Sequence, residues 1–244
     1  MTKASRVSVI GVLLVGVLSP PARVSAQQRP AIADQIAKTY GLDSFSQIDA
    51  IRYTFNIDLA ALKLKLSRTW IWEPKTDQIS YEGKDKAGNP VKVTYSRSQL
   101  ASQSAIVKEE VDPGFFNDQY WLLFPFHLVW DTGATVEDAG TQKLPLGKGS
   151  AKKVAVKYAS GGYTPGDTWE LFVGTDGRIR EMEFHHGGSA KPSVVLATWA
   201  DYKKAGPLLF SLDHRGKADG KPFRLFFSNV AVKLAGSNTW VNAQ

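Results

Sequence analysis

Hydrophobic and polar residues alternate through most of the chain. Tyr53, Phe55 and Ile57 alternate with polar neighbours, and a second alternating run extends from Leu62 to Trp72. A period of two residues is typical of strands that bury one face and leave the other in water. The pattern therefore predicts antiparallel strands with one wet face.

Further short runs continue the same alternation. Asp176 and Gly177 lie between two of these runs, where a tight turn needs the positive φ that glycine tolerates. The runs are Ile79–Tyr81, Val91–Tyr95, Val154–Tyr158, Trp169–Val173, Met182–Phe184, Val195–Trp199, Leu208–Leu212 and Val230–Leu234. We therefore expect a mainly β protein with a curved antiparallel sheet of about ten strands, forming a half or incomplete barrel.

An N-terminal helix is expected before the sheet. Ile32 and Ile36 are four residues apart in the segment Ala31–Tyr40 and so share one helix face. Gly41 follows directly and is suited to end the helix.

A second helical segment is apolar on almost all sides. Asp112 and Pro113 suit an N-cap and a first turn, and mostly aromatic and aliphatic residues follow. Pro125 is expected to end the helix at Phe124, because the residue before proline disfavours the α region. A helix this apolar must be covered, so we expect it on the concave face of the sheet. A filled core and a mobile plug over an apolar cavity both fit this geometry.

The N-terminus has the pattern of an export signal. A basic start with Lys3 precedes the uncharged run Val7–Leu18, and small residues lead up to Ala26. The run is about 12 residues long, whereas a membrane-spanning helix needs about 20. We expect residues 1–26 to be a cleavable signal and residues 27–244 to form one domain in the periplasm or outside the cell, without a transmembrane segment.

Charge and cysteine content restrict the possible partners. The formal net charge is +7, but three of the positive charges lie in the expected signal. The remaining basic residues are mixed with acids, whereas nucleic-acid binding relies on a concentrated basic stripe. We therefore expect no nucleic-acid partner.

The chain has no cysteine, so an apolar core must stabilise the domain without disulfides.

Histidines are the main candidates for catalysis. His185 and His186 are adjacent, so on a strand they point to opposite faces and do not readily chelate one ion; we expect an exposed strand end. His214, between Asp213 and Arg215, is either in a charged turn or a base oriented by a carboxylate. No Gly-x-Ser-x-Gly motif supplies a nucleophile. We expect no metal, cofactor or catalytic residue, and a hydrolase or isomerase using one of these histidines is the less favoured alternative.

The order of the elements resembles the lipoprotein-carrier superfamily of bacterial envelopes, the Lol-type half-barrel proteins. The likeness spans Ala31–Leu234. Arg68–Pro74 is similar to the early strands of such carriers, and Tyr120–Leu123 with Pro125 is similar to their cavity-side helix. The resemblance implies a binding protein, not an enzyme, that holds a lipid, an acyl chain or another apolar molecule between a curved sheet and a covering helix.

Arg68 is the most informative residue within that framework. Strand parity places it on the same face as Leu66 and Trp70, where a guanidinium is costly unless it is paired. It is expected to meet a ligand carboxylate or phosphate, to turn outward, or to pair with an internal acid such as Glu170. The residues expected to contact the ligand are Leu64, Leu66, Arg68, Trp70, Trp72, Tyr120, Trp121, Phe124 and Trp169. An envelope scaffold with a filled core and no ligand remains an alternative.

Overall fold

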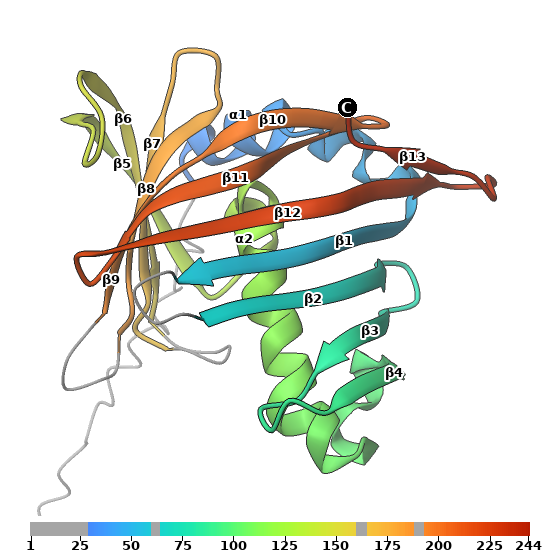
Figure 1. The fold of residues 1–244 in the computed structure, drawn as a ribbon. Helices are drawn as coiled ribbons and strands as arrows, with labels where there is room; N and C mark the ends of the chain where they lie inside the picture. The colour runs from blue at the N-terminus through green and yellow to red at the C-terminus, as the bar shows by residue number, and fades with distance from the viewer. Residues whose placement is uncertain (1–28, 60–63, 160–164, 188–192) are drawn as a thin grey trace, which may run out of the picture.

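The computed structural model describes residues 29–59, 64–159, 165–187 and 193–244. The expected signal, residues 1–26, lies outside the described residues. The described part forms one 13-stranded antiparallel sheet whose main path runs β4-β3-β2-β1-β12-β11-β9-β8-β7-β6-β5. The sheet is curved but does not close, because β4 and β5 remain as its two edges (Figure 1). The expected open, mainly β architecture is confirmed.

The strands follow the predicted alternation closely in the first half of the chain and are often longer than the apolar runs. Their bounds are β1 Ile48–Leu59, β2 Leu64–Glu73, β3 Gln78–Lys84, β4 Pro90–Ser96, β5 Ala134–Lys143, β6 Ser150–Tyr158, β7 Thr168–Val173, β8 Ile179–His185, β9 Val194–Thr198, β10 Ala200–Ala205, β11 Leu208–Ala218, β12 Lys221–Leu234 and β13 Trp240–Asn242. Arg68 lies opposite Phe55, which lies opposite Phe227, so these three residues form one row across β2, β1 and β12.

The alternating pattern does not predict three of these strands. β5 is an edge strand with a single buried residue, Val136, so it has almost no apolar signal of its own. β10 and β13 are short and pair only with β11 and β12, respectively, among the described strands. These strands are defined by backbone pairing with a neighbouring strand and not by an apolar pattern, so the sheet has 13 strands where the pattern predicts about ten.

The expected strand Val195–Trp199 is broken at its end. β9 stops at Thr198, and β10 starts again at Ala200 along the same partner, β11. Backbone pairing is interrupted here, and side chains of Thr198 and His214 make hydrogen bonds across the interruption. This interruption places the Trp199 side chain beside β11 in the interior.

Two α-helices accompany the sheet. α1 spans Ala31–Thr39 and ends, as expected, where Gly41 adopts a φ of 104°. α2 spans Asp112–Trp130 and runs along the inner face of the curved sheet (Figure 1). Shorter helical segments are η1 Leu42–Gln47, η3 Arg97–Ser102 and the π-helical η4 Val107–Val111.

The second helix has Pro113 in its first turn, as expected, but its expected C-terminal end is wrong. Pro125 lies inside α2, and the helix continues to Trp130 because the sheet encloses its last turns and buries Phe126 and Leu128. Burial of these side chains outweighs the hydrogen bond that proline removes. Asp112 lies inside the helical path rather than at its N-cap, since that path already starts in η4. Its buried carboxylate accepts hydrogen bonds from Tyr95 and Arg97.

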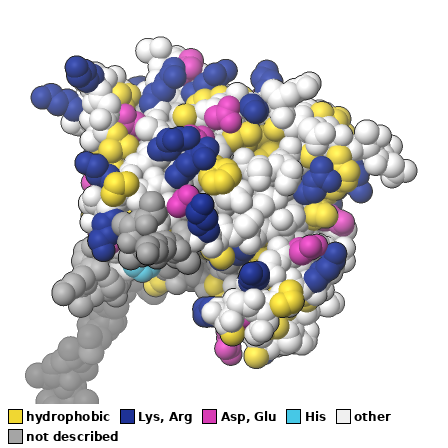
Figure 2. All heavy atoms as spheres, in the orientation of Figure 1, with side chains coloured by type: hydrophobic (Ala, Val, Ile, Leu, Met, Phe, Trp, Pro, Cys, Tyr) yellow, Lys and Arg dark blue, Asp and Glu magenta, His cyan; other side chains and the backbone are white. Residues whose placement is uncertain are grey.

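The outer surface is polar and of mixed charge. Figure 2 shows Lys and Arg side chains spread over the visible face, with acids and apolar side chains between them. Several of the charges pair across strands, as in Lys92 with Glu82 and Lys152 with Asp138. Among the described residues, no helix combines the length and apolar character needed to cross a bilayer.

Candidate ligand-binding interior

Arg68 is paired inside the molecule. Its Nε and Nη2 donate to Asp118 Oδ2 and Oδ1 at 2.8 and 2.5 Å, and Trp70 Nε1 donates to Oδ2 at 2.8 Å. Asp118 on α2 is fully buried, and Asn117 also donates to it. A Cβ added at Gly114 would lie 3.3 Å from Arg68, so glycine allows the guanidinium to approach α2 closely. β2 and α2 are therefore joined by a charged cluster.

The internal acid is Asp118 rather than Glu170. Glu170 instead pairs with Lys153 at 2.7 Å on the other half of the sheet. Burial raises the pKa of the Asp118 carboxyl, while the Arg68 guanidinium opposes that rise. Because both guanidinium contacts go to one carboxylate, the charge of Arg68 is already balanced before any ligand is considered.

The other expected contact residues fall into separate groups. Trp121 and Phe124 of α2 pack on Trp169 of β7, with ring centroids 5.5 and 4.3 Å apart. Trp72 lies by Phe115 at the opposite end of the sheet, 6.1 Å away. Leu66 is half-buried, whereas the side chain of Leu64 lies outside the described part of the chain. The structure thus brings together two clusters, one around Arg68 and one around Trp121.

Tyr120 belongs to a third cluster at the C-terminal end of α2. Its hydroxyl and that of Tyr158 donate to Asp131 Oδ2 at 2.6 and 2.7 Å, and His127 Nδ1 lies 3.0 Å from Oδ1. Hydrogen bonds from these groups hold the pKa of Asp131 below its usual value despite burial. The His127 ring is stacked on Tyr120 with 3.8 Å between centroids. The carboxylate therefore ties the helix end to β6, while the Tyr120 ring also packs on Phe124, 6.0 Å away between ring centroids.

Six buried polar side-chain atoms have no hydrogen-bond partner among the described residues: Arg52 Nε, Tyr53 Oη, Gln119 Oε1, His127 Nε2, Trp199 Nε1 and His214 Nε2. Tyr53, Trp199 and His214, which lie on the sheet, are 0%, 3% and 0% exposed. The Trp199 and His214 rings are in contact, with centroids 4.8 Å apart, and Trp121 of α2 lies 5.7 Å from His214. The unpaired atoms of Trp199 and His214 therefore lie between the sheet and α2.

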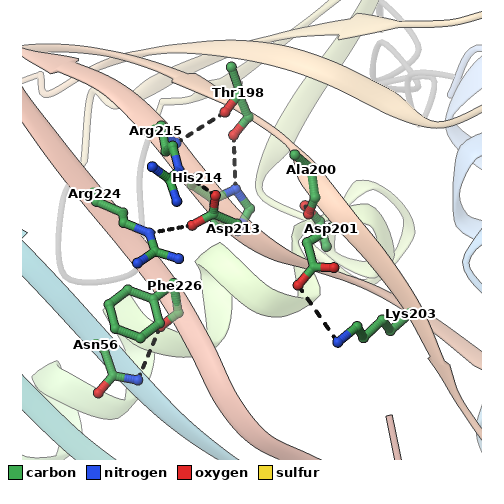
Figure 3. A network of polar contacts seen from close by, with 11 residues as sticks. Asn56, Thr198, Ala200, Asp201, Lys203, Asp213, His214, Arg215, Arg224 and Phe226 are labelled. Atoms are coloured by element: carbon green, nitrogen blue, oxygen red, sulfur yellow. Dashed lines mark hydrogen bonds and ion pairs between the residues drawn. The ribbon is translucent and has the colours of Figure 1, made fainter. Parts of the chain in front are cut away.

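His214 is neither in a turn nor oriented by a carboxylate, so both sequence-based expectations for it are wrong. It lies within β11, and its Nδ1 is 3.1 Å from the Thr198 carbonyl oxygen (Figure 3). The adjacent carboxylate of Asp213 points to the opposite face, where it binds Arg215 and Arg224. Adjacent strand residues face opposite sides of a sheet, which separates the two groups.

The protonation of His214 follows from these contacts. A carbonyl oxygen only accepts, so Nδ1 carries the proton and Nε2 is an acceptor. Burial lowers the pKa of His214 to about 4, with the Thr198 carbonyl and Asp213 opposing that shift. At neutral pH the interior therefore contains an uncharged imidazole with an available lone pair.

His185 and His186 lie at the end of β8, as expected, but they are half-buried rather than fully exposed. They contact different acids, Glu183 and Asp167, at 3.0 Å. Glu170 and Glu183 are cross-strand partners, so together with His185 they bring three possible metal ligands to one face. Lys153 already supplies a positive charge to Glu170, and we assign no metal there.

Sequence analysis missed Asp118 and did not foresee the burial of His214, although both carry a signal. Asp118 is an acid in the middle of an otherwise apolar helix, and such a charge needs a buried partner. His214 continues the parity of Phe210 and Leu212, so the alternation itself directs it to the apolar face.

Comparison with known proteins gives similarity at the level of overall shape. No protein-family model and no curated protein matches the chain. Among solved structures, a DUF1329 family protein from Desulfovibrio piger matches with a TM-score of 0.45 and 10% identity, covering 85% of this chain and 94% of its own. A LolA superfamily protein from Nitrosomonas europaea matches with a TM-score of 0.45 and 8% identity, covering 81% and 92%.

A third solved structure, named as an outer membrane lipoprotein-sorting protein domain, comes from Vibrio parahaemolyticus. It matches with a TM-score of 0.47 and 12% identity, covering 87% of this chain and 95% of its own. All three solved structures are at most 12% identical to this chain, with TM-scores between 0.45 and 0.47, so the similarity is one of broad architecture.

Proposed function

We propose that this protein is an exported binding protein, not an enzyme, that holds an apolar or amphiphilic molecule between its curved sheet and α2. The observation that carries the proposal is the set of unpaired polar atoms on Tyr53, Trp199 and His214, which are three of the six buried polar atoms without a partner among the described residues. A buried polar group without a partner costs about 1–3 kcal/mol, and native proteins normally pair such groups. A ligand that carries a polar group would pair them.

The surroundings of these atoms supply the apolar part of the proposed site. Trp121 contacts His214, Phe223 and Trp169 within 6.3 Å between ring centroids. Burial of an acyl chain against such rings would contribute about 25 cal/mol per Å² removed from water. Affinity would therefore come from apolar area, and the polar atoms would fix the orientation of the ligand.

Native mass spectrometry of the mature protein, starting at Gln27, tests this proposal. The protein would be purified gently from an envelope extract, and then incubated with 1-monopalmitoylglycerol or palmitate. We expect a defined adduct, either co-purified or taken up, and weaker uptake by Trp121→Phe than by the matched variant Trp240→Phe. Trp240 lies in β13 beside Arg52, away from α2. The absence of any adduct under all these conditions would refute ligand binding.

A scaffold with a filled core is the second candidate. It is favoured by the enclosure of α2, in which Leu122, Leu123, Phe124 and Phe126 are at most 1% exposed. For such a protein, native mass spectrometry would show the mass of the polypeptide without an adduct. Its partners would be envelope proteins and not lipids.

A further inference from the structure

We infer that Trp199 and His214 form a subsite for an uncharged hydrogen-bonding group, such as a hydroxyl, ester or amide, and that the bound molecule is a neutral amphiphile. This inference rests on the proposed function, since it names the class of molecule held between the sheet and α2. It concerns the polar end of that molecule only.

The two side chains offer complementary hydrogen-bonding atoms in one place. Trp199 Nε1 is a donor without a partner among the described residues, and His214 Nε2 is an acceptor without one. Their rings are 4.8 Å apart at 71°, and both side chains are at least 97% buried. A hydroxyl donates and accepts, so it satisfies both atoms at once, whereas an ester or amide carbonyl accepts from the indole.

The Trp199–His214 pair lies between the sheet and α2, where the ligand is proposed to bind. His214 is in contact with Trp121 of α2 at 5.7 Å and with Phe227 of β12 at 5.9 Å. Phe227 has no polar side-chain atom, and the Trp121 indole does not donate to His214 Nε2, which has no partner among the described residues. The polar atoms therefore lie at an apolar interface between helix and sheet, where a tail and a neutral head are both accommodated.

Charge argues against an anionic head group at this subsite. A carboxylate has only acceptors, so it would face the lone pair of His214 Nε2 without a proton to share. Protonation of the ring would remove that conflict, but burial strongly favours the neutral imidazole at pH 7. Arg68, the cation expected from the sequence to bind such a group, is bound through two nitrogens to Asp118.

The experiment compares two molecules with the same tail and different heads. The mature protein would be titrated at pH 7.5 with 1-monopalmitoylglycerol and with palmitate, both below their aggregation concentrations, and binding followed by tryptophan fluorescence and native mass spectrometry. We expect the glyceride to bind at least tenfold more tightly. Trp199→Phe and His214→Phe should each weaken glyceride binding about tenfold and leave palmitate binding within a factor of two.

Matched variants separate this effect from general damage. Trp240→Phe and His185→Phe change the same residue types outside the interior and should preserve the preference. If His214→Phe fails to fold, Trp199→Phe tests the subsite by itself, because it removes the indole N–H and keeps an aromatic ring. Equal or tighter binding of palmitate, or an unchanged preference in Trp199→Phe, would overturn the inference and leave the proposed function standing. Failure of both molecules to bind would remove the proposed function and this inference with it.

Discussion

Single residues in this protein determine how the helix is held against the sheet. Asp118 is the common acceptor for Arg68 and Trp70, and it is completely buried. Removal of one partner from a buried ion pair lowers the free energy of unfolding far more than loss of an exposed pair, because the remaining charge is left buried without an opposite charge. The cluster therefore matters for stability whatever the protein binds.

Substitution Asp118→Ala tests this role. It leaves the Arg68 guanidinium and the Trp70 N–H without their shared acceptor, so we expect a loss of about 3 kcal/mol in the free energy of unfolding. Urea denaturation followed by circular dichroism would measure it. Asp49→Ala is the control, since it breaks an exposed pair with Lys75 and should barely move the midpoint. Similar midpoints for the two variants would contradict the assigned role of Asp118.

His214 predicts a dependence of stability on pH. Its pKa falls from 6.5 to about 4 on folding because burial penalises the charged ring. Between pH 4 and 6.5 the His214 side chain binds a proton in the unfolded chain but not in the folded protein. The contribution of the neutral ring to the free energy of unfolding is therefore complete above about pH 6.5 and is lost as the pH falls toward 4. The loss is on the order of 3 kcal/mol.

Urea midpoints measured from pH 7.5 to 4 would reveal this loss. His214→Phe cannot titrate and should show a clearly shallower fall than the parent protein over that range. The carboxyls of Asp131 and Asp213 have lowered pKa values, so their contributions are lost at still lower pH. Parallel curves for the parent and His214→Phe would show that the imidazole does not titrate differently in the folded state.

At the scale of elements, turns and breaks position the strands and helices. Gly41 links α1 to η1 at a φ of 104°, and a Cβ there would lie 2.5 Å from the Pro207 carbonyl oxygen. In β12, Asn229 at a φ of 55° forms a bulge opposite β1, where the register shifts between Arg52 and Thr54. A bulge of this kind increases local twist and so helps the sheet to curve around α2.

Gly41→Ala and Gly88→Ala form a matched pair at this scale. Both glycines have positive φ, but nothing lies within 4 Å of a Cβ at Gly88. We expect Gly88→Ala to cost about 1 kcal/mol from backbone strain alone. Gly41→Ala should cost clearly more, because the methyl group also collides with backbone. Thermal unfolding would compare them, and equal losses would argue against the close approach at Gly41.

At the scale of the whole molecule, the described residues form one sheet around α2, and the segment expected to be an export signal lies outside them. The prediction concerns processing. We expect the mature protein to begin at Gln27, because small residues precede this position and the apolar run is too short to serve as a stable anchor.

Intact mass and N-terminal sequencing of the protein from an envelope fraction would measure the cleavage site. Ala26→Tyr should block cleavage by placing a bulky side chain directly before the site, whereas Ala22→Tyr should be processed normally. Recovery of the full-length parent protein would contradict the signal.

The sequence by itself determined the fold class and most of the strands. Period-two alternation specifies which face of each strand is buried, and the parity of Leu66, Arg68 and Trp70 placed these residues on one face. Gly41 and Gly177 marked turns because few other residues tolerate their positive φ. These are local properties, so they can be read from short stretches of chain.

Only the tertiary structure decided which residues meet. The pairing of Arg68 with Asp118 joins positions 50 residues apart, and the contact of His214 with Trp121 brings β11 against α2. The continuation of α2 past Pro125 and the formation of β5 depend on surrounding elements that supply burial or hydrogen bonds. Such interactions act across the fold and leave little trace in local periodicity, which is why sequence analysis predicted the faces of Arg68 and Trp70 but not their shared partner, Asp118.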